Sequence, residues 1–392
     1  MQFADERSVM RHALSLAQRG EGRVEPNPMV GAVLVDSELR AVGEGWHDRF
    51  GGPHAEVVAL RQAGSAARGA TLFVTLEPCA HQGKTPPCAD AVVAAGVQRV
   101  VVAMGDPNPL VDGRGLRLLE AAGLKVELGL MGAEAAVVMA PFLQLVTTGR
   151  PWVHAKWAMT LDGKIASRTG ESKWISNAAS RALTHRLRGR MDAIVVGIGT
   201  ALADDPLLTA RPPGPRNPVR VVIDSHARLP LTSQLVGSSN SAALWIAVTP
   251  AAPSARVEAL RSAGAEILVC PVEDREATEG SGRIDLRWLL QELGRRRLTN
   301  VLVEGGGEIL GALHDQDLID EFHVFLAPRL LGGEAARSPL LGLGRRRPSP
   351  DGWLQPWTVE SLDGDVYLRC RASDRRHSDR GSLPGGDAGG VA

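Results

Sequence analysis

The sequence predicts two α/β domains in succession. Apolar strand-like runs alternate with helix-like segments, and this pattern restarts after Gly149-Arg150-Pro151. Alternating strands and helices are typical of layered α/β domains, and Gly with Pro at a break in the pattern is typical of a linker. A chain of 392 residues is long enough for two or three domains at roughly 100–200 residues each. We therefore expect the first domain at 1–148 and the second at 149–372.

The elements expected in the first domain alternate throughout, as judged from apolar periodicity and turn residues. In chain order they are a helix at 5–19, strands at 30–35 and 41–45, a helix at 55–63, a strand at 70–76, a helix at 90–95, a strand at 99–104, a helix and a strand within 114–130, and a helix at 132–147.

The second domain repeats the alternation without an internal repeat linking the halves. Its expected elements are a strand at 152–159, a helix at 177–190 with Ser176 as its N-cap, strands at 193–196, 219–223, 243–248 and 267–270, a helix at 285–296, a strand at 300–303, a helix at 307–315 and a strand at 321–326. The last residues, from Ser373 to the end, contain almost nothing apolar, so we expect this tail to be disordered.

Composition narrows the classes of partner. Lys and Arg number 44, as do Asp and Glu, so the formal net charge is zero, and the chain lacks the basic footprint of a nucleic-acid-binding protein. No apolar run reaches the length of about 18 residues that a membrane-spanning helix needs, and the N-terminus lacks the apolar core of a signal peptide. Four cysteines do not make a disulfide scaffold. We expect a cytoplasmic protein with a small-molecule substrate and neither nucleic acid nor membrane as partner.

Three short segments of the first domain carry metal-binding side chains: His54-Ala55-Glu56, Pro78-Cys79 and Cys88. Zinc takes imidazole and thiolate ligands in a tetrahedron, and a catalytic site leaves one position for water, whose pKa the metal lowers toward neutrality. His54, Cys79 and Cys88 supply three ligands and leave the fourth position open. Glu56 is free to take the proton from water and deliver it to a ring nitrogen and the leaving amine. This order of residues is the signature of zinc deaminases that act on cytosine or adenine rings.

Each of these residues also has a purely structural interpretation. Taken singly, His54 would be a surface residue and the cysteines small buried side chains, but their order and the strand before Pro78-Cys79 favour the metal site. The spacing departs from the usual Cys-x-x-Cys, since eight residues separate Cys79 from Cys88.

Three nearby polar residues leave two interpretations open. His81 and Lys84, in the segment between the cysteines, either face an anionic substrate or belong to a solvated loop. Asn27 lies between two prolines, so it is either a turn residue or a substrate contact.

At these residues the sequence resembles the bifunctional riboflavin-biosynthesis deaminase–reductases. In the first half the resemblance rests on Pro26-Asn27-Pro28-Met29-Val30-Gly31, His54-Ala55-Glu56 and Thr75-Leu76-Glu77-Pro78-Cys79 with Thr85-Pro86-Pro87-Cys88. The long cysteine spacing fits that family. In the second half it rests on Lys156-Trp157-Ala158-Met159-Thr160-Leu161-Asp162-Gly163-Lys164, Glu171-Ser172, Trp174-Ile175, Gly199-Thr200, Asp204-Asp205-Pro206 and Val303-Glu304-Gly305-Gly306.

The resemblance implies both a fold and an activity. It implies a cytidine-deaminase-like three-layer domain followed by a dihydrofolate-reductase-like domain. The first would use Zn²⁺ to deaminate 2,5-diamino-6-(5-phosphoribosylamino)pyrimidin-4-one by hydrolysis. The second would use NADPH to reduce the ribosyl group of 5-amino-6-(5-phosphoribosylamino)uracil to ribityl. We also expect a homo-oligomer.

The resemblance further implies roles for single residues. Those implied to bind NADPH are Ala158, Trp174, Thr200, Asp204, Ser225, Gly306, Gly307, Glu308, Ile309, Leu310, Gly311 and Ala312. Those implied to contact substrate are Asn27, Ser172, Arg188, Leu207, Arg211 and Glu304. Asp204 is also implied to act near the hydride transfer, and Lys156 could stabilise negative charge or phosphate nearby.

Taken by their chemistry alone, the reductase residues leave alternatives open. The glycines after Glu304 either bring backbone N–H groups to a phosphate at a helix N-terminus or form a structural turn. They do not follow the Gly-x-Gly-x-x-Gly pattern, because residue 310 is Leu. Arg188 either binds phosphate through its fork or lies on a solvated helix face, and Asp204 could merely lie in a turn.

Three hypotheses about function follow. The first is a two-domain enzyme in which deamination precedes reduction of the sugar. The second is a deaminase of a nucleoside or RNA base with a binding module attached, which the neutral charge and the glycine-rich turn disfavour. The third is a structural zinc protein, which the presence of only three evident ligands and of Glu56 disfavours.

Overall fold

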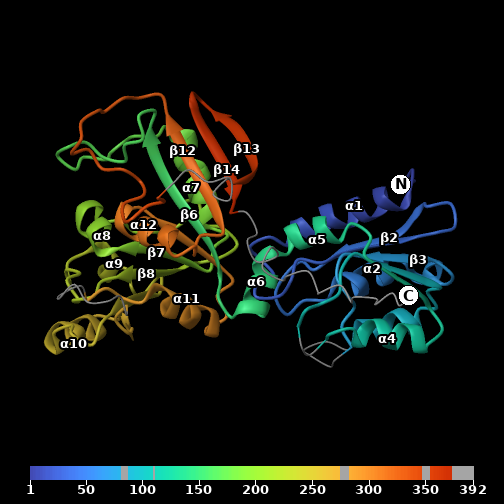
Figure 1. The fold of residues 1–392 in the computed structure, drawn as a ribbon. Helices are drawn as coiled ribbons and strands as arrows, with labels where there is room; N and C mark the ends of the chain where they lie inside the picture. Colours follow the sequence, from blue (N-terminus) through green and yellow to red (C-terminus); the bar gives the residue numbers. More distant parts are fainter. Residues whose placement is uncertain (81–86, 109–110, 274–281, 347–353, 373–392) are drawn as a thin grey trace, which may run out of the picture. The chain divides into compact units, whose positions relative to one another are not determined.

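The computed structural model describes residues 1–80, 87–108, 111–273, 282–346 and 354–372. Within these residues the chain forms two compact units. The first comprises Met1–Trp152 and Ala182–Val303, and the second comprises Val153–Arg181 and the chain from Glu304 onward. All strands of a five-stranded sheet precede residue 149, and all strands of a nine-stranded sheet follow it (Figure 1). The domain boundary expected between 148 and 149 stays a prediction, and the tail from Ser373 lies outside the described residues.

The five-stranded sheet has the order β2-β1-β3-β4-β5. Strand β1 pairs antiparallel with both β2 and β3, whereas β3, β4 and β5 run parallel. The strands are β1 (Gly31–Val35), β2 (Ala41–Trp46), β3 (Thr71–Val74), β4 (Arg99–Val102) and β5 (Lys125–Leu128). The helices of this part are α1 (Glu6–Ala17), α2 (Ala55–Ala63), α3 (Cys88–Ala94), α4 (Arg114–Ala121), α5 (Gly132–Val138) and α6 (Ala140–Thr148).

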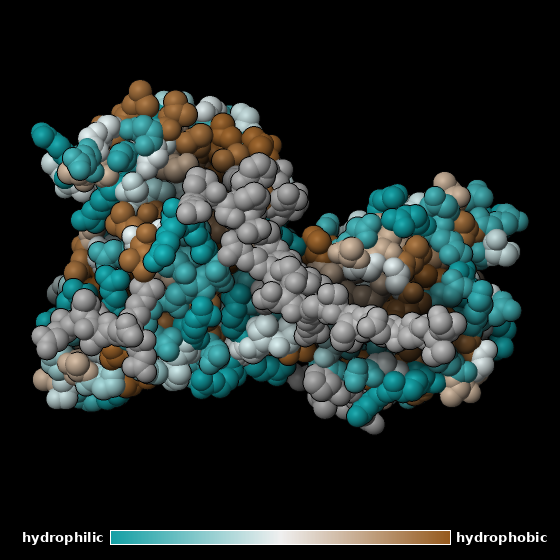
Figure 2. Space-filling view, viewed as in Figure 1, coloured by the Kyte–Doolittle hydropathy of each residue, from teal (hydrophilic) through white to brown (hydrophobic). Residues whose placement is uncertain are grey.

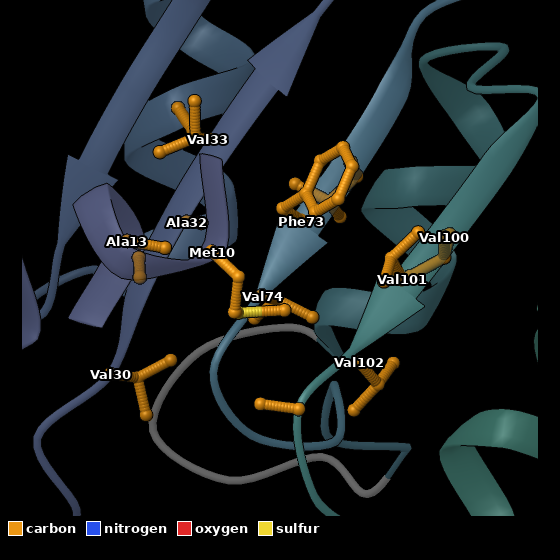
Figure 3. Close-up of a cluster of buried hydrophobic side chains, with 14 of the residues drawn as sticks. Met10, Ala13, Val30, Ala32, Val33, Phe73, Val74, Val100, Val101 and Val102 are labelled. Atoms are coloured by element: carbon orange, nitrogen blue, oxygen red, sulfur yellow. The ribbon is translucent and has the colours of Figure 1, made fainter. Parts of the chain in front are cut away.

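The core of this part lies along the central strands. Strand β1 is buried at all positions and β3 and β4 at all but their first. Strands that are covered on both faces consist of continuous apolar residues and do not alternate with polar ones. Figure 3 shows Val33, Phe73 and Val101 from three neighbouring strands in one cluster with Met10 of α1. One candidate metal ligand, Cys79, follows the buried strand β3 of this core.

One predicted helix of this part is wrong. The segment 132–147 was expected as a single helix, but it forms α5 and α6, which are separated at Met139. Pro141 lies in the first turn of α6. Proline has no N–H and its ring clashes with the preceding turn, so a helix interior excludes it but a first turn accepts it.

The nine-stranded sheet has the order β10-β9-β8-β7-β11-β6-β12-β14-β13. The pairs β10–β9, β9–β8, β8–β7, β7–β11 and β6–β12 are parallel, whereas β12–β14 and β14–β13 are antiparallel. The strands are β6 (Trp152–Thr160), β7 (Ala193–Gly197), β8 (Val219–Ile223), β9 (Leu244–Val248), β10 (Glu266–Val269), β11 (Asn300–Glu304), β12 (Glu321–Ala327), β13 (Gln355–Leu362) and β14 (Asp365–Arg371). The helices are α7 (Ala178–Arg188), α8 (Ile198–Asp204), α9 (Gln234–Gly237), α10 (Ser254–Ser262), α11 (Leu286–Arg295) and α12 (Gly307–Asp315).

The expected N-cap of α7 is wrong by one residue. The helix begins at Ala178, and the side-chain oxygen of Asn177, not Ser176, accepts a 2.9 Å hydrogen bond from the backbone N–H of Ser180. A cap side chain satisfies a first-turn N–H that has no partner inside the helix. The sequence analysis also missed helices α8, α9 and α10 and the hairpin of β13 and β14.

Apolar side chains remain exposed on the outermost strand. Figure 2 shows hydrophobic residues on the face in view over β13, where Val359 keeps 64% of its surface exposed. Within the described ranges, no helix has both the length and the apolar character required to cross a membrane.

Candidate zinc site and candidate reductase site

Helix starts and a strand exit position the three predicted metal ligands. His54 is the N-cap of α2, with extended backbone, so its ring lies ahead of the first helical turn. Cys79 follows β3, and Cys88 is the first residue of α3 after the N-cap Pro87. A helix N-terminus favours a thiolate because its backbone dipole is positive there.

The three ligand atoms converge. His54 Nδ1 lies 3.2 Å from Cys88 Sγ and 3.6 Å from Cys79 Sγ, and all three atoms lie within 4.8 Å of one another. The backbone N–H of Cys88 donates to Cys79 Sγ at 3.4 Å. Hydrogen bonding with Cys88 and His54 lowers the pKa of the Cys79 thiol to about 4. One imidazole and two sulfur donors, one readily deprotonated, fit the chemistry of zinc.

Glu56 lies beside these ligands in the first turn of α2 and is 3% exposed. Its Oε2 atom is buried and has no hydrogen-bond partner among the described residues. Burial raises the pKa of the Glu56 carboxyl to about 6. A buried polar atom without a partner costs free energy, so this oxygen fits an atom that the protein itself does not supply, such as a water or a substrate nitrogen.

The carboxylate of Glu77, two residues before Cys79, accepts backbone hydrogen bonds beside the candidate zinc site. Glu77 is buried, and its two oxygens accept backbone hydrogen bonds from Asp106, Gly113 and Gly115. Gly113 is the N-cap of α4, so Glu77 satisfies N–H groups that the helix leaves unpaired. From the sequence Glu77 stands out only as part of a motif, because its partners Asp106, Gly113 and Gly115 lie far along the chain.

Asn27 reaches the zinc site through a histidine that the sequence analysis also missed. Asn27 Nδ2 lies 3.3 Å from His47 Nε2, and the His47 and His54 rings have centroids 5.3 Å apart. His47 Nδ1 donates to the carbonyl of Pro53 at 3.0 Å, which leaves Nε2 as an acceptor for the Asn27 amide. The position of His47 at the end of β2 was its only sequence signal. His81 and Lys84 lie outside the described residues.

Several predicted reductase residues lie near the carboxyl ends of parallel strands in each unit. In the first unit, Thr200 lies in the helix that follows β7, and Ser225 follows β8, which pairs with β7. In the second unit, Ala158 lies two residues before the end of β6. Ligands of α/β proteins bind outside the carboxyl ends of parallel strands, so these positions suit a cofactor. Trp174 is 62% exposed and stacks on Arg181.

The glycine run after β11 has a packing role as well. Gly305 has φ +85°, which favours glycine. A Cβ at Gly307 would lie 2.5 Å from the carbonyl oxygen of Ser338, and one at Gly311 would lie 1.1 Å from that of Leu341. These two glycines therefore admit the segment 338–341 against α12. The remaining residues of the predicted run, from Glu308 to Ala312, lie within α12, whose first turn offers N–H groups to an anion.

Two charged residues of the second unit, Lys156 and Glu304, lie close to each other, and Glu304 directly precedes the glycine run. Glu304 is buried at the end of β11, and its Oε2 atom lies 4.0 Å from Lys156 Nζ. Lys156 Nζ also lies 5.5 Å from the centre of the Phe325 ring. Asp204 is the last residue of α8 and so does not lie in an isolated turn. Ser172 is half-buried in the segment before Trp174.

The remaining predicted substrate residues lie on one loop and the helix beside it. The loop 205–211 follows α8 and carries Leu207 and Arg211. The carbonyl of Thr209 accepts from Arg188 Nη1 at 3.3 Å and lies 3.2 Å from His185 Nδ1. Arg211 Nη1 donates to Thr209 Oγ1 at 3.3 Å. Arg188, Arg211 and His185 thus all contact Thr209, and His185 was not singled out from the sequence.

Comparison with known proteins decides the family. A family model of the RibD C-terminal domain matches residues 151–366, more than half of the chain. The chain belongs to the RibD family. A second model, of the cytidine and deoxycytidylate deaminase zinc-binding region, matches residues 4–104, which include every predicted zinc ligand and Glu56.

Relatives in this family match most of the chain. The riboflavin biosynthesis protein RibD of Escherichia coli K12 is 43% identical over 340 residues, covering 83% of this chain and 88% of that protein. RibD of Actinobacillus pleuropneumoniae is 39% identical over 359 residues, covering 92% and 93%. A solved structure of Acinetobacter baumannii RibD has a TM-score of 0.81 at 38% identity, covering 94% of this chain and 99% of that one.

The sequence-based predictions of family, α/β class and activity are therefore confirmed. The chain is a bifunctional riboflavin-biosynthesis enzyme with a zinc-binding deaminase domain and a reductase domain. This result favours the two-domain enzyme over the deaminase with a binding module and over the structural zinc protein.

Proposed function

We propose that the deaminase domain hydrolyses the exocyclic amine of 2,5-diamino-6-(5-phosphoribosylamino)pyrimidin-4-one. A Thermotoga maritima structure, 34% identical with a TM-score of 0.78 and covering 93% of this chain and 98% of that one, is named as a diaminohydroxyphosphoribosylaminopyrimidine deaminase/5-amino-6-(5-phosphoribosylamino)uracil reductase. The observation that carries the proposal is the convergence of His54, Cys79 and Cys88 beside the unpaired, buried Glu56 Oε2.

In this proposal His54, Cys79 and Cys88 hold Zn²⁺. The bound metal supplies Lewis-acid activation of water at neutral pH. Glu56 would take the proton of the attacking water at Oε2 and deliver it to the ring nitrogen. It would then transfer a second proton, from the hydroxyl now bound to the ring carbon, to the amine, which leaves as ammonia while the carbonyl forms. Asn27 contacts the pyrimidine, and His47 holds the Asn27 amide in place through the 3.3 Å contact.

We further propose that the reductase domain uses NADPH to reduce the ribosyl group of 5-amino-6-(5-phosphoribosylamino)uracil to ribityl. The cofactor supplies the hydride, and the protein binds and orients it. The residues proposed to bind NADPH are Ala158, Trp174, Thr200, Asp204, Ser225 and Gly306–Ala312, which lie on or after the strand ends described above.

The charges around these residues suit a phosphorylated sugar. Arg188 and Arg211 approach the same residue, Thr209, and arginine binds phosphate through paired N–H groups. We assign them to the phosphate, with Leu207 and Ser172 beside the ribosyl group. Glu304 and its neighbour Lys156, 4.0 Å away, contact the sugar where the hydride is transferred, and Asp204 acts as a polar group near that transfer.

We propose small molecules alone as ligands, without nucleic acid. A cytoplasmic location and a homo-oligomeric state stay predictions. Light scattering of the purified chain tests the latter, and a mass equal to one chain would contradict it.

The test of the proposed function is a paired assay on the diaminopyrimidine ribotide. Ammonia release is followed with and without NADPH, and NADPH oxidation is followed in parallel. We expect ammonia without NADPH and oxidation only after deamination. Release of ammonia without any NADPH oxidation would contradict the reductase assignment. Absence of both signals from zinc-loaded protein would contradict the proposed substrate.

A further inference from the structure

Arg220 is a buried cation of the reductase domain that pairs with no carboxylate among the described residues. Arg220 lies on β8 and is fully buried. Within the described residues no carboxylate lies within ion-pair distance of its guanidinium, and its Nε atom is buried without a hydrogen-bond partner. An isolated buried charge costs several kcal/mol, so a guanidinium retained at such a position needs a reason beyond packing.

The Arg220 side chain is held by oxygens of two neighbouring segments. Nη1 donates to Ser238 Oγ at 2.6 Å and to the carbonyl of Leu207 at 3.4 Å. Nη2 donates to the carbonyls of Ser238, at 3.2 Å, and Ala242. The planar fork of arginine offers five N–H donors in a fixed geometry, whereas an ammonium group offers three around a single atom and an apolar side chain offers none. Arg220 therefore ties the loop 205–211 at Leu207 to the chain after α9.

A second connection runs from the same side chain to the start of the loop. Ser238 Oγ accepts from Arg220 and donates to the carbonyl of Gln234 at 2.5 Å. The Gln234 backbone N–H donates to Asp205 Oδ1 at 2.8 Å, and its side-chain amide donates to the Asp205 carbonyl. The loop is thus fixed at both Asp205 and Leu207 by one network centred on Arg220.

The loop backbone requires such fixing. Asp205 has φ +39° and Leu208 has φ +52°. Residues other than glycine adopt positive φ at a cost in free energy, and this conformation persists only where surrounding contacts impose it. Leu208 is buried in the apolar core of this part, and its neighbour Thr209 accepts hydrogen bonds from Arg188 and Arg211.

We propose that Arg220 is a positioning residue of the reductase. Its guanidinium fixes the loop 205–211 in the shape that presents Leu207 and Arg211 to the phosphoribosyl substrate. This inference rests on the proposed assignment of Leu207 and Arg211 to substrate binding.

The test uses the full chain with three substitutions. R220M removes the charge and its donors, R220K keeps the charge but not the fork, and S238A removes only the hydroxyl that links the network. R295M is the matched control, because Arg295 lies on the surface of α11, paired with Glu292. Each variant is assayed for reductase KM and kcat, for ammonia release and for competitive inhibition by ribose 5-phosphate.

We expect R220M and R220K to raise the KM for the phosphoribosyl substrate and the inhibition constant of ribose 5-phosphate by about tenfold, and S238A by about threefold. Ammonia release and the KM for NADPH should stay within about twofold of the unsubstituted chain, as in R295M. An unchanged substrate KM would overturn the proposal. A loss of equal size in ammonia release, substrate KM and NADPH KM would also overturn it, because that pattern indicates general unfolding.

Hydrogen exchange separates this inference from the proposed function. If the unsubstituted chain fails to oxidise NADPH with the uracil ribotide, the proposed function fails. The exchange rates of the amides in 205–211 still test Arg220, without any substrate. Faster exchange in R220K or S238A than in R295M supports positioning of the loop, and equal rates contradict it.

Discussion

Glu77 Oε1 accepts a 2.9 Å hydrogen bond from the backbone N–H of Gly115, and this contact ties the start of α4 to the segment that carries Cys79. The contact depends on glycine, because a Cβ at residue 115 would lie 1.9 Å from the carbonyl oxygen of Pro78. A real side chain cannot approach so closely, so either α4 or the Pro78-Cys79 segment would have to move.

We therefore predict that G115A loses zinc. The displaced Cys79 would leave the three-atom cluster, and bound zinc per chain, measured by elemental analysis, should fall severalfold together with ammonia release. Gly237, which has open space where a Cβ would lie, provides the control G237A. Full zinc content in G115A would show that Pro78 does not constrain the metal site.

Arg188 allows a matched test of phosphate binding. Loss of a charge-assisted hydrogen bond to phosphate costs roughly 1.5–3 kcal/mol, so R188M should raise the KM for the phosphorylated reductase substrate by about tenfold to a hundredfold. The dephosphorylated analogue should be turned over equally by R188M and the unsubstituted chain.

The control lies on the same helix. Arg186 is exposed two residues away, so R186M should behave as the unsubstituted chain. Equal losses on phosphorylated and dephosphorylated substrates in R188M would remove the phosphate assignment.

A buried histidine predicts how stability depends on pH. His323 is 1% exposed and lies 3.1 Å from His154 and 2.7 Å from the hydroxyl of Tyr367. Burial lowers the pKa of His323 to about 3, whereas an unfolded histidine titrates near 6.5. At pH values between these two pKa values, His323 is protonated in the unfolded chain but not in the folded chain. The free energy of unfolding should therefore fall as the pH drops below about 6.5, by up to about 1.4 kcal/mol per pH unit for this proton.

The single tyrosine of the chain reports on this site directly. Urea unfolding between pH 7.5 and 5.5 can be followed by the NMR signal of ¹³C-labelled Tyr367. H323F should flatten the pH dependence, and H226Q, at an exposed histidine, should leave it unchanged. If the free energy of unfolding depends on pH equally in H323F and in the unsubstituted chain, a group other than His323 causes the acid sensitivity.

The sequence was sufficient to select three candidate metal ligands whose donor atoms converge in the structure, and to predict most strands. His54 caps α2, Cys79 follows β3 and Cys88 begins α3, so order and spacing along the chain carried the information. The break at Met139 was readable in principle from Pro141, because proline in a helix interior is excluded. The N-cap of α7 was missed by one residue because Ser176 and Asn177 are both good caps, and only the hydrogen bond to Ser180 distinguishes them.

Other parts of the sites depend on contacts distant in sequence. Arg220 stands in an apolar strand, where a single cation would ordinarily point to solvent. Its burial depends on oxygens of Leu207, Ser238 and Ala242, which only the folded sheet brings together. His47 and Glu77 likewise gain their roles from partners on other elements. Local periodicity carries no information about such partners.

The most direct test of the central account, two separable activities in one chain, is E56Q. Zinc content, ammonia release from the diaminopyrimidine ribotide and NADPH oxidation with the uracil ribotide are measured on the same preparation. Removing a general acid/base should lower ammonia release by about 10²- to 10⁴-fold, while zinc and NADPH oxidation stay as in E134Q, a substitution at an exposed ion pair. Undiminished ammonia release with zinc bound would contradict the role of Glu56, and loss of both activities together would contradict their separation.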